Sequence, residues 1–465
     1  MRLVLLASIL AFNPALSVAG DSLDSLLSSV PSGLEWLRPA DASSGECGAS
    51  QGCSLDEELG LSFWEDQAWK VGGSYRIRYH NERNIRPSGL TGDDDEFTLH
   101  QTRIWLDGDL HERIKFRAGM IDAASFGESI RPRGNEVNRF DLYQLYFDVL
   151  LNEGDDSWTA RIGRQEIRLG SARLIMAPIW ANRRRTHDGV RFMRRGSDWD
   201  VDAFWLRPAF RNVDKFTEFD STNHNQQLYG IFNTYKGYEH STVELYWLAF
   251  DIANASGAGG ARYDTIGSRA YGDIDELLYE AEGGIQFGRN PDDTEHSAGF
   301  FTGGIGKGFK DVCWKPEVWV FYDFASGSGR TGNGFHTYVQ RAHYYLGFMD
   351  LFGRRNLEDV NARLTLKPAD ELTFVVWYHY FSLATGKDVP YNLNMQPFNG
   401  LTAGSAGSQE LGHELDLSLT WEPNEKTQIR IAYSHFWAGR FYDTTPGVPT
   451  NSDADFFYTH CQIKF

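Results

Sequence analysis

The sequence predicts an all-β chain: a single antiparallel transmembrane β-barrel of about 18 strands, with long loops on one side and a short irregular N-terminal extension. Three observations lead to this prediction. Short segments alternate between apolar and polar side chains, the chain begins like an exported protein, and aromatic residues make up 14% of it. After the N-terminus, no apolar run approaches the roughly 20 residues that a transmembrane helix needs.

The N-terminus has the features of a secretory signal peptide. Met1 and Arg2 precede an apolar run over residues 3–12, and small residues occupy the third and first positions before Gly20. This combination is typical of a cleaved export signal, so residues 1–19 are expected to be removed after Ala19. The alternative is an ordinary buried helix, which Pro14 would interrupt.

Residues 20–69 are rich in Ser, Gly, Asp and Leu and are predicted to form a loosely ordered N-terminal extension. It is interpreted as a periplasmic extension, a plug that enters the pore, or a disordered linker. Cys47 and Cys53 flank a short glycine-rich stretch and are disulfide candidates in an oxidising compartment. Two cysteines are too few to hold zinc, and no metal site is expected. The sequence leaves open whether Cys313 and Cys461 pair.

From residue 70 to residue 465 the side chains alternate with a period of two, which is typical of strands. For example, Tyr75 and Ile77 alternate with Arg76 and Arg78. In a soluble sandwich the apolar faces would pack together, whereas in a membrane barrel they meet lipid and the polar faces meet water. The chain ends on a strand-like run closed by Phe465, which is characteristic of outer-membrane barrels. Residues 70–465 are therefore predicted to be the barrel.

Between about sixteen and nineteen strand segments can be counted, and eighteen is chosen because bacterial single-chain barrels use even numbers. Eighteen strands would leave an aqueous lumen. The count is ambiguous at residues 173–180, 189–195 and 335–346. Three long segments are predicted to be loops, either extracellular or folded into the pore, namely residues 252–276, 325–356 and 383–409.

Arginines recur on the polar face of the predicted strands. Guanidinium stays charged at all working pH values and binds carboxylates through paired hydrogen bonds, and rings of Arg or Lys select anions in pores. The predicted pore-lining and substrate-binding residues are Arg76, Arg103, Arg117, Arg161, Arg191, Arg363 and Arg430. The acids that share this face are Asp148, Glu244, Glu282, Glu414 and Asp416. Ion pairs are expected to neutralise part of the arginines; the alternative is that the arginines only brace the wall.

Other functional classes find little support. The net charge of −18 argues against a nucleic-acid binder. The sequence contains no zinc-binding HExxH and no phosphate-binding loop, and its one Gly-x-Ser-x-Gly pattern, residues 48–52, lies in the predicted extension. The glycine-rich stretch 302–308 is interpreted as barrel wall, and His187-Asp188 as a loop contact instead of a catalytic pair. No catalytic residue and no cofactor are expected.

Three parts of the sequence resemble the alginate export porin family. The first is residues 162–174 (Ile-Gly-Arg-Gln-Glu-Ile-Arg-Leu-Gly-Ser-Ala-Arg-Leu), followed by 180–184 and 188–191; the others are 343–350 with 356–360, and 410–417. The resemblance implies a monomeric eighteen-stranded barrel in the bacterial outer membrane, through whose arginine-lined pore a uronate polymer leaves the periplasm. The inward arginines of the family have counterparts by strand parity in Arg76, Arg103, Arg117, Arg161, Arg363 and Arg430.

The sequence therefore predicts an outer-membrane pore for an anionic polysaccharide or sugar acid similar to alginate. The alternatives are a general anion or small-solute porin and an outer-membrane barrel enzyme. A porin needs an open lumen, an exporter should be narrowed by loops and gated by a periplasmic partner, and an enzyme needs a hydrogen-bonded nucleophile and base. The expected partners are outer-membrane lipid, the anionic solute and a periplasmic export partner.

Overall fold

The computed structural model describes residues 69–465 except 87–88, 153, 155, 178, 211–217, 254–259, 275 and 339–341. The predicted signal peptide and the Cys47–Cys53 disulfide lie outside the described residues, as does the extension up to residue 68. The first strand begins at Trp69.

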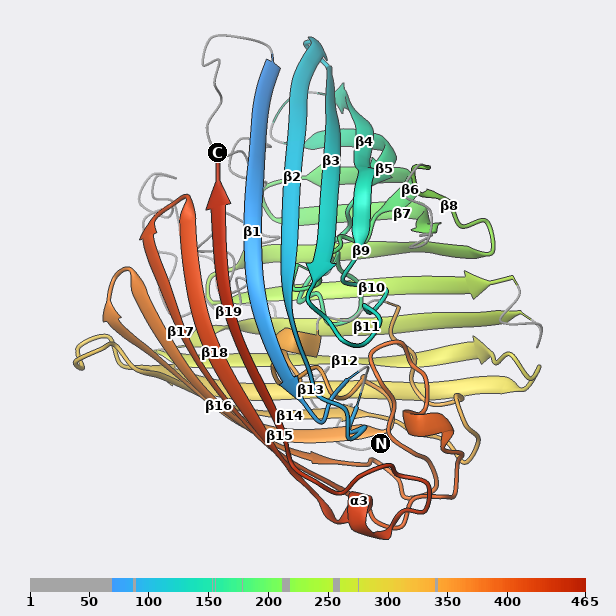
Figure 1. Ribbon diagram of the computed structural model, residues 1–465. Coiled ribbons are helices and arrows are strands. Elements are labelled where there is room, and N and C mark those ends of the chain that lie inside the picture. Colours follow the sequence, from blue (N-terminus) through green and yellow to red (C-terminus); the bar gives the residue numbers. More distant parts are fainter. Residues whose placement is uncertain are drawn as a thin grey trace.

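The described chain forms a closed antiparallel β-barrel (Figure 1). Of nineteen strands, β8 (Ser221–Thr222) has two residues and pairs only with the end of β7. The other eighteen each pair with two neighbours, and β1 pairs with both β2 and β19, which closes the ring. The prediction of an eighteen-stranded barrel is confirmed.

The strands of the ring follow the order of the chain. They are β1 (Trp69–Arg83), β2 (Asp95–His111), β3 (Ile114–Phe126), β4 (Asn138–Asn152), β5 (Ser157–Gln165), β6 (His187–Arg195), β7 (Trp199–Phe210), β9 (Gln226–Tyr238), β10 (Ser241–Ile252), β11 (Ala261–Ile274), β12 (Leu277–Arg289), β13 (Glu295–Gly308), β14 (Glu317–Ala325), β15 (Leu357–Ala369), β16 (Leu372–Ser382), β17 (Glu410–Asn424), β18 (Thr427–Ala438) and β19 (Ala454–Lys464).

The two ends of the barrel differ in their connections. Short turns, such as 370–371 and 425–426, join strands at the end where β1 begins and β19 finishes. The long connections 166–186, 326–356 and 383–409 all lie at the other end, so long loops on one side are confirmed. In outer-membrane barrels the short turns face the periplasm and the long loops face outward.

One predicted loop is wrong, and the three ambiguous segments are settled. Segment 252–276 contains β11, whose backbone pairs with both β10 and β12. Small side chains at Gly267, Ser268 and Gly272 interrupt the alternation, which hid this strand in the sequence. Residues 189–195 belong to β6, whereas the described residues of 173–180 and 335–346 lie in loops. Stretch 302–308 is part of β13, as expected.

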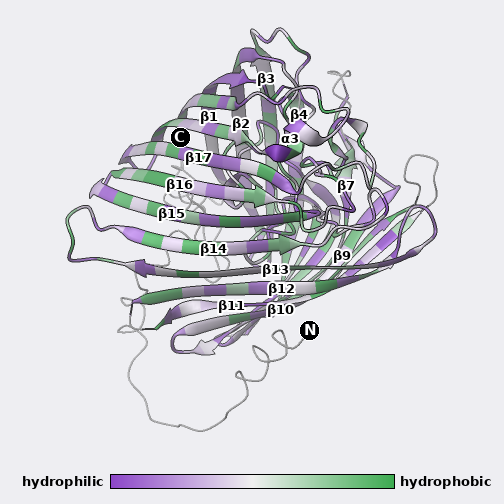
Figure 2. Cartoon of the chain, turned by 90° about the horizontal axis from the view of Figure 1, so that it is seen from below, coloured by the Kyte–Doolittle hydropathy of each residue, from purple (hydrophilic) through white to green (hydrophobic). Residues whose placement is uncertain are grey.

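The outer wall is apolar and the inner side of the strands is polar. In β1, Tyr75 and Ile77 are exposed, whereas Arg76 and Arg78 are buried. The same alternation gives most strands their mixed hydrophobic and hydrophilic bands in Figure 2. Large apolar side chains on the outer wall suit contact with lipid. None of the helices in the described part of the chain is long and apolar enough to cross a membrane.

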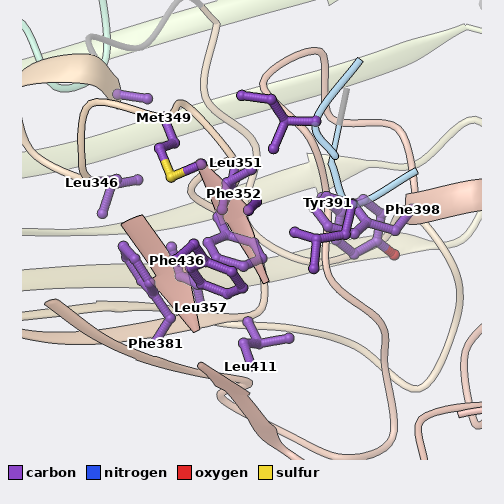
Figure 3. Packing of buried hydrophobic residues seen from close by; sticks show 14 of the residues in the cluster. Leu346, Met349, Leu351, Phe352, Leu357, Phe381, Tyr391, Phe398, Leu411 and Phe436 are labelled. Carbon is purple, nitrogen blue, oxygen red and sulfur yellow. The ribbon is translucent and has the colours of Figure 1, made fainter. Parts of the chain in front are cut away.

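Buried apolar clusters lie inside the barrel because loops fold into it. Figure 3 shows one of them, in which Leu351 and Phe352 of segment 326–356 pack against wall and loop residues. The ring of Phe352 lies 5.0 Å from that of Phe381 in β16 and 5.6 Å from that of Phe398 in segment 383–409. The interior is thus narrowed by packed loops.

Candidate functional site

The segment 166–186 between β5 and β6, here called the first inward loop, crosses the interior of the barrel. From β1, Arg76 donates hydrogen bonds to the carbonyl oxygens of Ile179 and Ala181, both at 2.9 Å. The side-chain amide of Asn182 donates to the carbonyl oxygens of His100 and Ala124 at 3.0 and 3.2 Å. These bonds satisfy backbone groups of a buried loop and fix its position on β1 to β3.

The other part of this loop is held by acids of β12. Arg173 is fully buried and forms ion pairs with Glu280 and Glu282. The Ser171 hydroxyl donates to Glu282 at 2.6 Å. Arg269 adjoins the same group, because it binds Glu280 at 2.8 Å and Glu244 at 3.3 Å. Glu244 and Glu282, two of the predicted lumen acids, are therefore bound by arginines.

Segment 326–356, the second inward loop, is anchored on β17. The backbone N–H groups of Phe348 and Met349 donate to Asp416 and Glu414 at 3.1 and 3.0 Å. Gly347 has a φ of +84°, and a Cβ at this position would lie 2.3 Å from a Glu414 carboxylate oxygen, so glycine is required. The acids Glu414 and Asp416 thus hold a loop.

The two inward loops meet over β1. The Trp180 ring lies between the Arg78 guanidinium, 3.6 Å from its centroid, and the His343 ring, whose centroid is 3.7 Å away. Burial lowers the pKa of His343, and the nearby Asp350 carboxylate, 3.5 Å from Nδ1, acts in the opposite direction. A neutral imidazole therefore suits this stack.

Three of the predicted arginines form ion pairs between neighbouring strands. Arg117 binds Asp107 at 2.7 Å, Arg161 binds the predicted acid Asp148 at 2.7 Å, and Arg191 binds Asp202 at 2.6 Å. All three pairs are largely shielded from solvent and lie on the side of the strands opposite the apolar outer wall. These arginines brace the wall at least in part.

The other four predicted arginines contact neutral groups. Arg430 donates to the Thr420 hydroxyl at 2.9 Å, the Arg363 guanidinium lies 5.3 Å from the Trp377 ring, and Arg76 donates to the carbonyls described above. Arg103 donates to the Ser74 hydroxyl at 3.1 Å. No carboxylate in the described part of the chain forms an ion pair with Arg103, although Glu166, which Arg184 binds, lines a cavity with it.

Basic residues gather on β18, β19 and β1 to β3. Arg76, Arg78, Arg103, Arg430 and His460 line one small enclosed cavity beside Trp180. Arg103 also lines a second cavity, nearer the short turns, with Arg117 and Lys464. These residues are called the basic face.

The basic face contains residues that the predicted site omitted. Arg78 shares the parity of Arg76 and could have been included from the alternation alone. His460 and Lys464 are also on this face, on the final strand.

The remaining candidates carry no catalytic arrangement. His187 starts β6 and lies 3.2 Å from the Tyr338 hydroxyl, while Asp188 binds Arg164 at 2.8 Å. Cys313 and Cys461 are both free thiols. Across the described ranges, no group of three or more potential ligands is placed to hold a metal ion.

The comparisons with known proteins agree with this geometry. OccK8 (OprE) of Pseudomonas aeruginosa has a similar structure, with a TM-score of 0.57 and 13% identity over 87% of this chain and 99% of that one. OprD of the same organism has a TM-score of 0.54 and 12% identity, over 86% of this chain and 94% of that one. OccAB1 of Acinetobacter baumannii has a TM-score of 0.56 and 11% identity, over 87% of this chain and 97% of that one. No curated protein matches the chain.

The family comparison covers most of the chain. The model of the family described as "Alginate export" matches residues 68–454. Together with the porin-like barrel, this match places the protein in the bacterial outer membrane as a pore-forming barrel. The chain belongs to the alginate export family.

Proposed function

We propose that this barrel passes an anionic polysaccharide or sugar acid, similar to alginate, along an arginine-lined lumen. The observation that carries the proposal is the basic face, where Arg76, Arg78, Arg103 and Arg430 share one cavity. Guanidinium groups replace the water around a carboxylate with paired hydrogen bonds. A solute with one carboxylate per sugar ring would meet several such groups in sequence.

The distribution of acids supports a net positive path. Glu244 and Glu282 are bound by Arg269 and Arg173, and Glu414 and Asp416 accept hydrogen bonds from the second inward loop. These carboxylates face neighbouring positive or N–H groups. The basic face, in contrast, includes Arg103, which has no ion-pair partner in the described part of the chain. Positive potential is therefore concentrated on one side of the narrowed interior.

The spacing of the basic groups suits stepwise movement. Residues on one face of a strand repeat about every 6.8 Å, so Arg78 and Arg76 form consecutive levels on β1. Arg103, paired opposite Ser74, forms the next level toward the short turns. Several weak sites in series allow an ion to enter and leave, whereas one strong site would trap it.

The inward loops favour a selective pore over a general porin, because a general porin needs a lumen open at rest. A barrel enzyme has less support. His379 lies 2.9 Å from Asp359, but it is fully buried, and the Ser434 hydroxyl donates to Asp416 and not to the imidazole. The proposal includes a monomeric barrel that receives its solute from a periplasmic partner.

Planar-bilayer recordings of the purified barrel test the proposal. The reversal potential in a salt gradient is expected to show anion selectivity, and a polyuronate added on the short-turn side should block the current. Arg103→Glu should lower both the selectivity and the block. Arg139→Glu is the control, because Arg139 is exposed and pairs with Asp122 on the outer wall. A cation-selective wild-type barrel would overturn the proposal.

A further inference from the structure

The outer wall of the barrel has a polar hollow at the long-loop end of β7 and β9 to β12. Its volume is about 750 Å³, and its lining includes Arg207, Gln227, Asp251, Arg262, Asp264 and Arg289. On the same strands, the positions next to these residues point inward and are buried, among them Leu206, Leu228, Phe250 and Tyr263. The lining of the hollow therefore faces away from the lumen.

An aromatic shelf lies directly beneath the hollow, on the side toward the middle of the membrane. It consists of Trp205, Tyr229 and Trp247. Each donates a hydrogen bond upward: Trp205 to Gln227 at 3.1 Å, Tyr229 to Asp251 at 2.8 Å, and Trp247 to Asp264 at 3.1 Å. Trp and Tyr in such positions mark the boundary between acyl chains and headgroups. The hollow therefore opens at the level of the lipid headgroups.

Arg207 supplies a positive charge at this level that no described carboxylate neutralises. Its guanidinium lies 5.1 Å from the Trp205 ring, and its Nη1 is 2.6 Å from Nδ1 of His224. Its Nε is buried and has no hydrogen-bond partner among the described residues. A half-buried guanidinium with unused donors is poised for an anion, since leaving buried donors unpaired is costly.

Arg262 provides a second guanidinium, whose orientation is fixed. Its Nε and Nη2 donate to Asp264 at 2.7 and 3.2 Å, and its plane lies 5.6 Å from the Tyr229 ring. Nη1 takes no part in this pair and is 3.9 Å from Asp251. Asp264 thus fixes the orientation of Arg262, which lines the hollow together with Asp251, its second ion-pair partner.

We infer that this hollow binds the phosphate of a phosphorylated glycolipid in the outer leaflet. Phosphate oxygens match the paired donors of guanidinium. Three arginines line the hollow beside three aspartates, and Asp264 and Asp293 are bound by Arg262 and Arg289, which leaves Arg207 as the arginine without a described carboxylate partner. The aromatic shelf contacts the apolar part of the same molecule. The site lies outside the lumen, so it is independent of the transported solute and of the proposed function.

Native mass spectrometry of the detergent-purified barrel tests this inference. The protein is titrated with diphosphoryl lipid A and with the same lipid after its phosphates are removed. We expect retention of the phosphorylated lipid and about a tenfold loss of apparent affinity in Arg207→Gln, the cost of one charge-assisted hydrogen-bonded contact. Arg139→Gln, an exposed arginine elsewhere on the outer wall, is the matched control and should bind like the wild type.

Two further arms make the result decisive. Arg207→Gln removes no ion pair with a described residue, so the barrel should stay folded, which the mobility of the unheated protein in a gel reports. Arg103→Glu should leave lipid retention unchanged, which separates this site from the lumen. Equal retention of the dephosphorylated lipid, no effect of Arg207→Gln, or displacement by inorganic phosphate at the lipid's concentration would each overturn the inference.

Discussion

Trp180 and His343 lie face to face, with their ring centroids 3.7 Å apart and their planes 9° from parallel. The two residues come from different inward loops, and Arg78 of β1 covers the second face of Trp180. This stack joins both loops to the wall that carries the basic face. The width of the passage therefore depends on contacts that hold the loops in place.

Removing the shared ring should loosen both loops. Trp180→Ala deletes the surface on which Arg78 and His343 stack, so the single-channel conductance is expected to rise and its fluctuations to increase. Planar-bilayer recordings provide the measurement. Trp314→Ala is the control, because Trp314 is 54% exposed in the connection between β13 and β14, at the opposite end of the barrel from the inward loops. An unchanged conductance in Trp180→Ala would show that the stack does not set the width.

The glycine at the anchor of the second inward loop should tolerate no side chain. Gly347→Ala places a Cβ against Glu414 at a positive φ, which costs on the order of 1–3 kcal/mol of loop docking. We expect faster limited proteolysis within residues 326–356. Gly329→Ala, in the same loop, meets nothing within 4 Å and should be cut at the wild-type rate. Equal proteolysis rates for Gly347→Ala and Gly329→Ala would contradict the role of Gly347 in anchoring the loop.

Acidification should widen the passage, because protonation of His343 weakens docking of the second inward loop. Burial holds its pKa below the ordinary 6.5, so the docked loop favours the neutral ring. Above pH 6.5 the ring is neutral in both the docked and the released loop, and titration has no effect. As the pH falls below that value, only the released loop takes up the proton, so docking weakens and conductance rises.

The His343→Gln variant separates this effect from titration of the wall acids. It should remove the part of the conductance change that begins just below pH 6.5 while leaving any change at lower pH. If the variant and the wild type respond identically, His343 is not the group that titrates.

Arg173 should be needed for the stability of the barrel. Arg173→Met leaves Glu280 and Glu282 buried without this partner, and breaking a buried ion pair on one side costs roughly 3–5 kcal/mol. The midpoint of thermal unfolding, followed by gel mobility, should fall. Arg330→Met is the control, because Arg330 is 65% exposed in its ion pair with Asp292. Adding Glu280→Gln to Arg173→Met should restore part of the loss; a further fall would contradict this explanation.

Much of the fold was predictable because each strand separates lipid from the interior. That separation imposes a period of two, which the sequence displays at Tyr75–Arg78 and in most other strands. It fails in β11, where small side chains such as Gly267 and Ser268 do not reveal which face is apolar. The predicted strand count rested on the even number of strands in bacterial single-chain barrels and not on any one segment.

The candidate site was predictable only in part. The alternation of side chains along each strand assigned Arg76 and Arg103 to the inner side of the barrel. Their role in transport stays a prediction. Parity does not reveal which acid each loop uses, because those contacts join distant residues: Arg173 and Glu280 are 107 positions apart, and Met349 and Glu414 are 65 apart. Such pairs depend on the path of the inward loops, which no local pattern encodes.

The acids that anchor the inward loops connect the width of the passage to the charge that it presents. When Glu414 loses its bond to Met349, or Glu282 its bond to Arg173, the passage widens and a bare negative charge is exposed to the solute in the same event. Release of an inward loop would therefore widen the passage and at the same time expose a carboxylate that repels polyanions. The width of the passage and its charge therefore change together, and under the proposed function a wider variant would need additional cationic side chains to keep passing an anionic solute.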